Sequence, residues 1–118
     1  ILLVEDEPAL LALTQTMLRD MGYKVLAAST PSEAVKLAEA HNKELDLLVT
    51  DVVMPEMNGR ELSHRIKEFL PELKCLYMSG YTENAVAHHG VLDQGLHFIP
   101  KPFSITDFSL KVKEALTE

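Results

Sequence analysis

The chain has 118 residues, 47% hydrophobic and 25% charged, with a formal net charge of −7. This balance is typical of one globular domain and disfavours disorder, collagen or a coiled coil. The negative charge repels nucleic acid and anionic lipid, so we expect no direct nucleic-acid binding. The single cysteine, Cys75, allows no intrachain disulfide and predicts a buried thiol in a cytoplasmic protein. No apolar run is long enough to predict insertion into a membrane.

Five short apolar runs recur at regular intervals along the chain. Each run shows little internal alternation, which is typical of strands that are buried on both faces of a parallel sheet. The predicted strands are residues 1–4, 23–28, 45–50, 73–78 and 96–99.

Segments with helical periodicity lie between these strands. The first begins near Pro8 and is expected to end at Gly22, because glycine favours the position after a helix. The second opens with Thr30 as the N-cap, Pro31 at the first helical position and Glu33 two residues later. These residues predict where two of the helices start and stop.

The later helices have weaker or less regular patterns. A third begins at Asn58 and is expected to turn Leu62, Ile66 and Phe69 inward, and a short, alanine-rich fourth covers about 82–89. The fifth begins at Ser104. The side chains that we expect it to bury are Ile105, Phe108, Val112 and Leu116.

Strand and helix thus alternate five times, which predicts an α/β fold of the (βα)₅ type. The expected architecture is a doubly wound, five-stranded parallel sheet of flavodoxin-like order 2-1-3-4-5, with helices on both faces. We expect residues 1–118 to form one domain. Because the sequence does not begin with Met, we also expect it to be a piece of a longer protein.

Charged and polar residues follow the strands that should flank the switch in strand order. Glu5 and Asp6 follow the first strand, Asp51 the third, Ser79 the fourth and Lys101 the fifth. Ligands of such sheets bind outside the carboxyl ends of the strands, so these side chains should converge. Carboxylates gathered there are tolerable around a cation, and oxygen ligands without His or Cys favour Mg²⁺.

The same arrangement suits a phosphoryl group. Mg²⁺ and the Lys101 ammonium would neutralise its oxygens, and the Ser79 hydroxyl would donate a hydrogen bond to one of them. A free Asp51 carboxylate would act as the nucleophile and form an acyl phosphate.

Four segments, taken in order, resemble the receiver domains of response regulators in two-component signalling. They are the acidic start at 1–7, the stretch 50–59, the hydroxyl motif at 78–80 and the Lys-Pro motif at 98–103. The segments 77–82, 87–92 and 98–104 further resemble the C-terminal receiver domains of hybrid sensor histidine kinases. The resemblance covers essentially the whole chain.

The resemblance implies a metal and phosphoryl site with defined roles. Asp51 would be the phosphoacceptor and a ligand of Mg²⁺, and Asp6 would bind the metal directly. Glu5 would bind it through a water molecule, and Val53 would contribute its backbone carbonyl. Ser79 and Lys101 would hold the phosphoryl oxygens.

It also implies a switch and a set of partners. Ser79 and Phe98 would move on phosphorylation, and the peptide bond before Pro102 would be cis. The donor would be a histidine kinase or a phosphotransfer domain. The surface built from 82–89, 96–99 and the last helix would change and would be the place for a homodimer. The domain itself would be cytoplasmic, whether or not its parent protein is attached to a membrane.

Val53 and Tyr81 stand at the two variable positions that flank the phosphoryl group in this family. Both are bulky, and neither is an acid or an amide. We expect them to hinder an attacking water molecule without orienting it, so the phosphorylated form should persist.

Three other interpretations compete with a receiver in a hybrid kinase. The domain could belong to a stand-alone or DNA-binding response regulator. An aspartyl-phosphate hydrolase needs a second acid two residues after its nucleophile, and Val53 occupies that position. A degenerate receiver used only for protein contact would lack site residues, yet all of them are present. We therefore expect a signalling domain that is not an enzyme in isolation.

Overall fold

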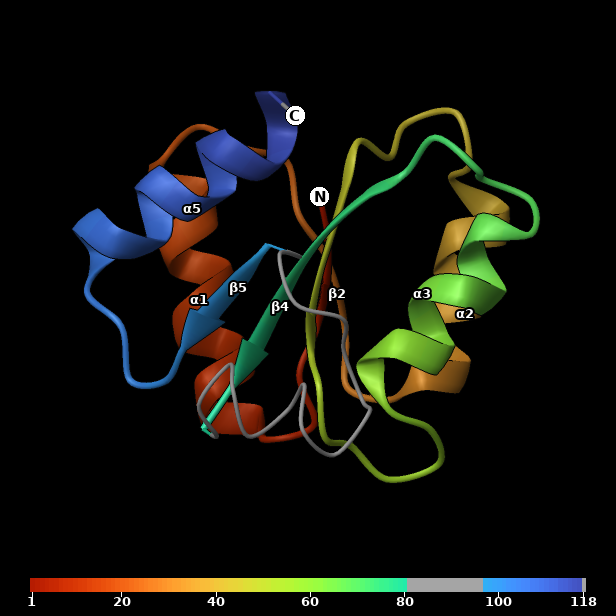
Figure 1. The fold of residues 1–118 in the computed structure, drawn as a ribbon, viewed down its shortest axis with the longest axis horizontal. Helices are drawn as coiled ribbons and strands as arrows, with labels where there is room; N and C mark the ends of the chain where they lie inside the picture. The colour runs from red at the N-terminus through yellow and green to blue at the C-terminus, as the bar shows by residue number, and fades with distance from the viewer. Residues whose placement is uncertain (81–96, 118) are drawn as a thin grey trace.

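The computed structural model describes residues 1–80 and 97–117. Five parallel strands form one sheet in the order β2-β1-β3-β4-β5, which confirms the predicted topology (Figure 1). Their bounds are β1 Leu2–Val4, β2 Leu26–Ala28, β3 Leu47–Asp51, β4 Lys74–Ser79 and β5 Phe98–Pro100.

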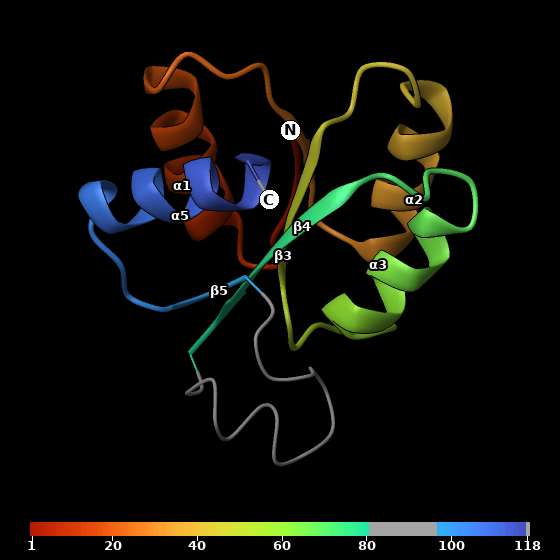
Figure 2. The same cartoon turned by 45° about the horizontal axis from the view of Figure 1, so that its top comes forward.

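The described helices cover the two faces of the sheet in pairs. Helices α1 (Pro8–Asp20) and α5 (Ile105–Thr117) lie against one face, and α2 (Pro31–Ala40) and α3 (Gly59–Lys67) lie against the other (Figures 1 and 2). The predicted helix at 82–89 lies outside the described residues.

The sheet divides the hydrophobic core into two clusters. Leu2 and Val4 of β1 belong to the cluster on the α2–α3 side, whereas Leu3 between them belongs to the cluster on the α1–α5 side. Successive side chains of a strand point to opposite faces, so a strand covered on both sides must be apolar throughout. This is why the five runs show so little alternation.

Side-chain caps and a glycine set the limits of the helices. The Thr30 hydroxyl accepts a hydrogen bond from the Glu33 backbone N–H at 3.1 Å, and Asn58 and Glu61 form a complete capping box. After α1, Gly22 adopts φ +96°, a conformation that favours glycine. The predicted starts of α2 and α3 and the end of α1 are therefore confirmed.

Two expected core residues are exposed instead. Phe69 is 38% exposed because α3 ends at Lys67, so the helical phase that would turn its side chain inward has already been lost. Ile105 is 51% exposed because it begins α5, and this helix packs on the sheet through its later buried residues. Phe108 and Val112 are buried as predicted.

The second predicted strand is also shorter than expected. Only Leu26–Ala28 pairs with β1, because β1 itself offers three residues, Leu2–Val4, as partners. The preceding Tyr23 and Val25 still pack against the core on the α1–α5 side. The apolar pattern therefore identified buried residues correctly, but the strand predicted from it was longer than the part that pairs with β1.

The start of β4 is tied to the end of the last helix. The Lys74 ammonium donates a hydrogen bond to the Leu116 backbone carbonyl at 2.5 Å. This carbonyl lies in the last turn of α5, where backbone acceptors lack partners within the helix. Among the described residues, no helix is both long enough and apolar enough to span a membrane.

Candidate functional site

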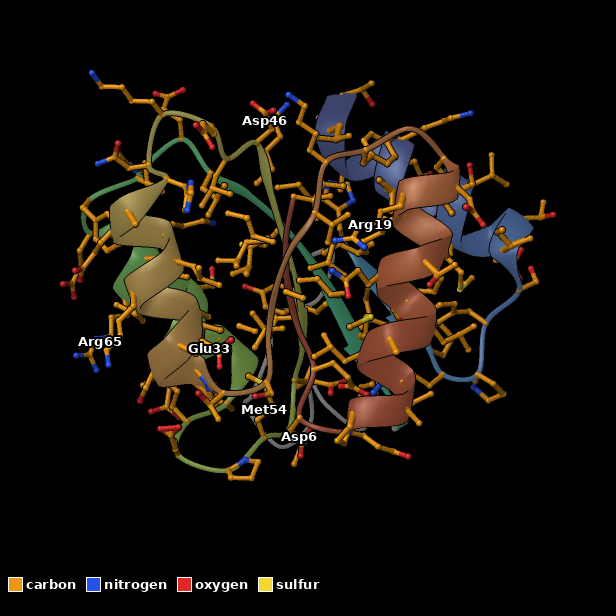
Figure 3. The ribbon with its side chains drawn as sticks, turned by 180° about the vertical axis from the view of Figure 1, so that it is seen from behind. Asp6, Arg19, Glu33, Asp46, Met54 and Arg65 are labelled. Carbon is orange, nitrogen blue, oxygen red and sulfur yellow. The ribbon has the colours of Figure 1, made fainter. Side chains whose placement is uncertain are left out.

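The predicted site residues gather at the carboxyl edge of the sheet. Glu5 and Asp6 follow β1 directly, Asp51 and Ser79 are the last residues of β3 and β4, and Lys101 follows β5. Figure 3 shows Asp6 near the lower edge of the molecule, close to the loop that carries Met54, and Asp46 at the opposite edge. The parallel topology thus brings together residues that are almost 100 positions apart, as Glu5 and Lys101 are.

Three carboxylates form the centre of the site. One oxygen from each of Glu5, Asp6 and Asp51 lies within 4.8 Å of the others. Glu5 and Asp51 are buried, and Asp6 is exposed. Such a cluster concentrates negative charge where water provides little screening, and it needs cationic partners.

Lys101 supplies one positive charge to this cluster. Its ammonium lies 2.9 Å from Glu5 Oε1 and also forms an ion pair with Asp51 Oδ1. The Lys101 backbone N–H donates to the Ser79 carbonyl at 2.7 Å, and the bond from Lys101 to Pro102 is cis, as predicted. One lysine therefore connects the ends of β1, β3, β4 and β5.

The protonation of Asp51 depends on a balance between burial and this lysine. Burial raises the pKa of the Asp51 carboxyl above its usual value, and the hydrogen bond and charge of Lys101 oppose that rise. Because burial has the larger effect, the Asp51 carboxylate is destabilised by its surroundings. An added cation would favour its ionised form.

The chemistry of the cluster fits a bound Mg²⁺. The second oxygen of Glu5, Oε2, is buried and has no hydrogen-bond partner among the described residues. A buried, unpartnered carboxylate oxygen is costly unless a cation or an ordered water molecule meets it. Oxygen ligands from Glu5, Asp6 and Asp51 match the preference of Mg²⁺, which also retains several waters.

The other expected site residues take up different positions. Ser79 is buried beside the site, and Phe98 is buried in the core on the α2–α3 side, with Tyr77 of β4 as its strand partner. The side chain of Val53 is 57% exposed, two residues beyond Asp51. Tyr81, the second flanking position, lies outside the described residues.

The backbone support of Asp51 was not identified from the sequence. The Gly59 N–H donates to the Val52 carbonyl at 2.7 Å, and a Cβ atom on Gly59 would stand 2.3 Å from the Asp51 carbonyl oxygen. The Thr50 hydroxyl donates to the same Asp51 oxygen at 3.0 Å. The Asn58-Gly59 pair was the available signal, because glycine can mark close backbone approach.

An apolar cavity beside the site was also missed. It has a volume of about 310 Å³ and lies between α1 and the segment that follows β5. Leu10, Leu13 and Met17 line it from α1, and Glu5 and Lys101 border it. Leu13, which lines this cavity, is 57% exposed.

The chain belongs to the family of response regulator receiver domains, whose family model matches residues 1–113. It is therefore a receiver domain of two-component signalling, a signalling domain, and its acidic cluster has the character of the family's metal site. The strand order and the arrangement of the described helices agree with this class.

The similar proteins include both kinases and response regulators. Sensor kinase CckA of Brucella abortus is 40% identical over 116 residues, which cover 98% of this chain and 12% of that protein. Response regulator SaeR of Staphylococcus aureus is 26% identical over 117 residues, which cover 99% of this chain and 50% of that protein. The chain thus spans at most half the length of these curated relatives.

Solved structures give the same class. The receiver domain of hybrid histidine kinase CckA superposes with a TM-score of 0.81 and 34% identity, covering 98% of this chain and 96% of that chain. A CheY-like receiver domain protein from Methanospirillum hungatei superposes with a TM-score of 0.78 and 33% identity, covering 98% and 91%.

Proposed function

We propose that residues 1–118 form one receiver domain in which Asp51 accepts a phosphoryl group from a phosphohistidine. The observation that carries this proposal is the position of the Asp51 carboxylate. It is buried, it lies within 4.8 Å of carboxylate oxygens of Glu5 and Asp6, and it is paired with Lys101. A structural aspartate would gain nothing from two further acids beside it.

The residues that would hold Mg²⁺ are Asp6 and Asp51, the Val53 backbone carbonyl, and Glu5 through a water molecule. Bound there, the ion would neutralise negative charge on the phosphoryl oxygens during transfer. The unpartnered Glu5 Oε2 supports this assignment, since it needs a donor or a cation. Asp6 is exposed and therefore accessible to an ion from solution.

The chain's own residues would carry out the transfer. An Asp51 oxygen attacks phosphorus in line, the new O–P bond forms, and the P–N bond to the donor histidine breaks with its electrons passing to the imidazole. The Lys101 ammonium, which now balances Glu5 and Asp51, would move onto a phosphoryl oxygen. The Ser79 hydroxyl would donate to another phosphoryl oxygen.

Phosphorylation would then change a surface. Movement of Ser79 toward the phosphoryl group would open space for Phe98, which is buried on β5 next to β4. The altered surface would comprise 82–89, β5 and α5 and would serve for output, including a homodimer. The partner that donates the phosphoryl group would be a histidine kinase or a phosphotransfer domain.

We further propose that the parent protein is a hybrid sensor histidine kinase located with its receiver in the cytoplasm. The 40% identity to sensor kinase CckA supports this origin. A stand-alone or DNA-binding response regulator is the alternative. The domains encoded next to this segment in the full-length gene would distinguish them, since a kinase core and a DNA-binding domain have different sequences.

Val53 should make the phosphorylated form persistent. Its exposed side chain is aliphatic and cannot orient a water molecule by hydrogen bonding. We expect Val53→Asn to shorten the lifetime of the phosphoform severalfold, measured by loss of the acyl phosphate after the donor is removed. An unchanged lifetime in this variant would show that the side chain at 53 does not control hydrolysis.

The central test is phosphorylation by acetyl phosphate with Mg²⁺, followed by intact-protein mass spectrometry. The wild-type chain should gain the mass of one phosphoryl group, and Asp51→Asn should gain none. Asp46→Asn is the matched control, because Asp46 is an exposed aspartate at the opposite edge of the sheet (Figure 3). Labelling of the Asp51→Asn variant to the wild-type level would refute the assignment.

A further inference from the structure

The loop from Asp51 to α3 is held closed at its base. The Gly59 N–H donates to the Val52 carbonyl at 2.7 Å, so the first and last parts of the loop are in contact. Inside the loop, Met54 packs on the α2–α3 core and its sulfur lies 3.8 Å from the Thr50 hydroxyl. The base of the loop is therefore closed, and Met54 gives its middle a side-chain contact with the core, whereas neither contact holds the backbone between Val53 and Glu56 directly.

The outer turn of this loop contains a backbone conformation that its residue does not favour. Glu56 has φ 74°, the one positive φ recorded for a non-glycine residue in the described part of the chain. A side chain with a Cβ avoids this left-handed region, and glutamate lacks the short polar side chain that makes it tolerable for Asn or Asp. The Met57 N–H donates to the Pro55 carbonyl at 2.9 Å across this turn, and a second stabilising contact comes from outside it.

That stabilising contact comes from α2. The Ser32 hydroxyl donates to Glu56 Oε2 at 2.7 Å, the length of a strong hydrogen bond to a carboxylate. Ser32 lies in the first turn of α2, where the helix dipole also favours a carboxylate. The bond joins two segments that are 24 residues apart, and both side chains are exposed.

We propose that Ser32 and Glu56 are positioning residues for the metal site, which hold the loop so that the Val53 carbonyl faces the bound cation. This inference rests on the proposed function, because it assumes that Mg²⁺ binds at Glu5, Asp6 and Asp51. Val53 lies between the fixed base of the loop and Glu56, so the Ser32–Glu56 bond limits rotation of the peptides that carry this carbonyl. Neither Ser32 nor Glu56 would itself be a ligand of the metal.

The decisive variant is Ser32→Ala, because it removes the bond without changing any charge. We expect it to weaken Mg²⁺ binding about threefold to tenfold, below the ~10–100-fold typical of groups that hydrogen-bond a metal ligand directly. Isothermal titration with Mg²⁺ alone measures the affinity, and thermal unfolding in metal-free buffer measures stability. Ser32→Thr keeps a hydroxyl and should retain the wild-type affinity.

Glu56→Ala should weaken Mg²⁺ binding as well, and the double variant S32A/E56A should be no weaker than Glu56→Ala alone. Glu33→Ala is the charge control, since it removes an acid from the same turn of α2. It should leave the affinity unchanged.

The outcomes separate this inference from the proposed function. If the wild-type chain binds Mg²⁺ and Ser32→Ala binds it equally well, the positioning role is wrong even if the variant unfolds at a lower temperature. Additive effects in the double variant would also overturn it. If the wild-type chain itself fails to bind Mg²⁺, the proposed metal site is wrong and the positioning role fails with it.

Discussion

Gly59 lies so close to Asp51 that a Cβ atom on Gly59 would stand 2.3 Å from the Asp51 carbonyl oxygen. Real Cβ atoms do not approach backbone oxygen so closely, so Gly59→Ala must displace either α3 or the end of β3. We expect this variant to lose about 1–3 kcal/mol of stability and to bind Mg²⁺ less tightly. Urea unfolding and metal titration measure the two effects.

Gly80→Ala is the matched control for this prediction. A Cβ atom on Gly80 would meet no atom within 4 Å among the described residues. The substitution should therefore cost much less than the one at Gly59. Equal losses for the two variants would show that the close approach at Asp51 is not what requires glycine.

Replacing the central acid should stabilise the metal-free protein. Burial raises the pKa of Asp51 in the folded state, so folding favours its protonated form. The contribution of Asp51 to the free energy of unfolding is therefore highest below the ordinary carboxyl pKa. It falls as pH rises through the raised pKa of the folded state, and it stays lower at neutral pH. Asp51→Asn removes that loss and should raise the thermal midpoint at neutral pH by a few degrees.

The exposed Asp46→Asn variant should change the midpoint little, because surface substitutions have small effects and its carboxylate interacts only weakly, with the N-terminal ammonium of Ile1. Added Mg²⁺ should stabilise the wild-type chain but not Asp51→Asn, since a ligand that binds the folded form alone raises its stability. A midpoint of Asp51→Asn below that of the metal-free wild type would contradict the electrostatic argument.

The apolar cavity beside the site should matter for a protein donor. Leu13 is 57% exposed on α1 and borders the 310 Å³ cavity that adjoins Glu5 and Lys101. If Asp51 is the phosphoacceptor that we propose, a donor histidine must reach it, and the protein that carries this histidine would cover this neighbourhood. We expect Leu13→Asp to slow transfer from a phosphorylated protein donor about tenfold or more, while the rate with acetyl phosphate stays unchanged.

Leu110→Asp tests whether the position of the charge matters. Leu110 is 59% exposed on α5, away from that cavity. Transfer from the protein donor to this variant should proceed at close to the wild-type rate. If both variants slowed transfer alike, or if Leu13→Asp also slowed labelling by acetyl phosphate, docking at α1 would not be the explanation.

The buried tyrosine of β4 should make the fold sensitive to alkali. Burial, with a smaller contribution from Cys75, raises the pKa of Tyr77 to about 12 from 10.0. Between these values the unfolded chain has lost the proton that the folded chain retains, so stability falls as pH rises from 10 to about 12. The loss is about 3 kcal/mol for this group.

Tyr77→Phe removes the ionising group and should flatten this part of the stability profile. Denaturant unfolding at several pH values between 10 and 12 measures how steeply the free energy of unfolding falls with pH in the wild type and in the variant. Burial also raises the pKa of the Cys75 thiol, so the variant should retain the part of the pH dependence that comes from that residue. Identical slopes in wild type and variant would mean that Tyr77 is not the group that titrates.

Much of the fold followed from the sequence because the apolar runs report burial directly. Strands covered on both faces are apolar throughout, and the alternation of these runs with helical segments predicted the order β2-β1-β3-β4-β5. The same pattern does not indicate where the backbone hydrogen bonding of a helix or strand ends. Phe69 keeps the helical spacing although α3 has ended at Lys67, and Tyr23 is apolar although β1 offers it no partner.

The sequence predicted which residues gather at one edge of the sheet, but it did not predict which of them form hydrogen bonds or ion pairs. Strand ends placed Glu5, Asp51 and Lys101 at one edge, because parallel topology fixes where strands finish. No pattern indicated that Lys101 would pair with Glu5 and Asp51 together, or that Ser32 would bond Glu56. Such contacts depend on rotamers and loop paths, which have no periodic signature in the sequence.

The two ends of strand β4 lie beside different parts of the molecule. The side chain of its first residue, Lys74, donates to the Leu116 carbonyl in the last turn of α5, and its last residue, Ser79, lies at the acidic edge. A six-residue strand spans about 20 Å, and extended backbone resists compression. A shift of Ser79 along the strand axis would therefore move Lys74 and disturb its hydrogen bond to the last turn of α5. Exchange of amide hydrogens in that turn would then report from afar on the chemistry at Asp51.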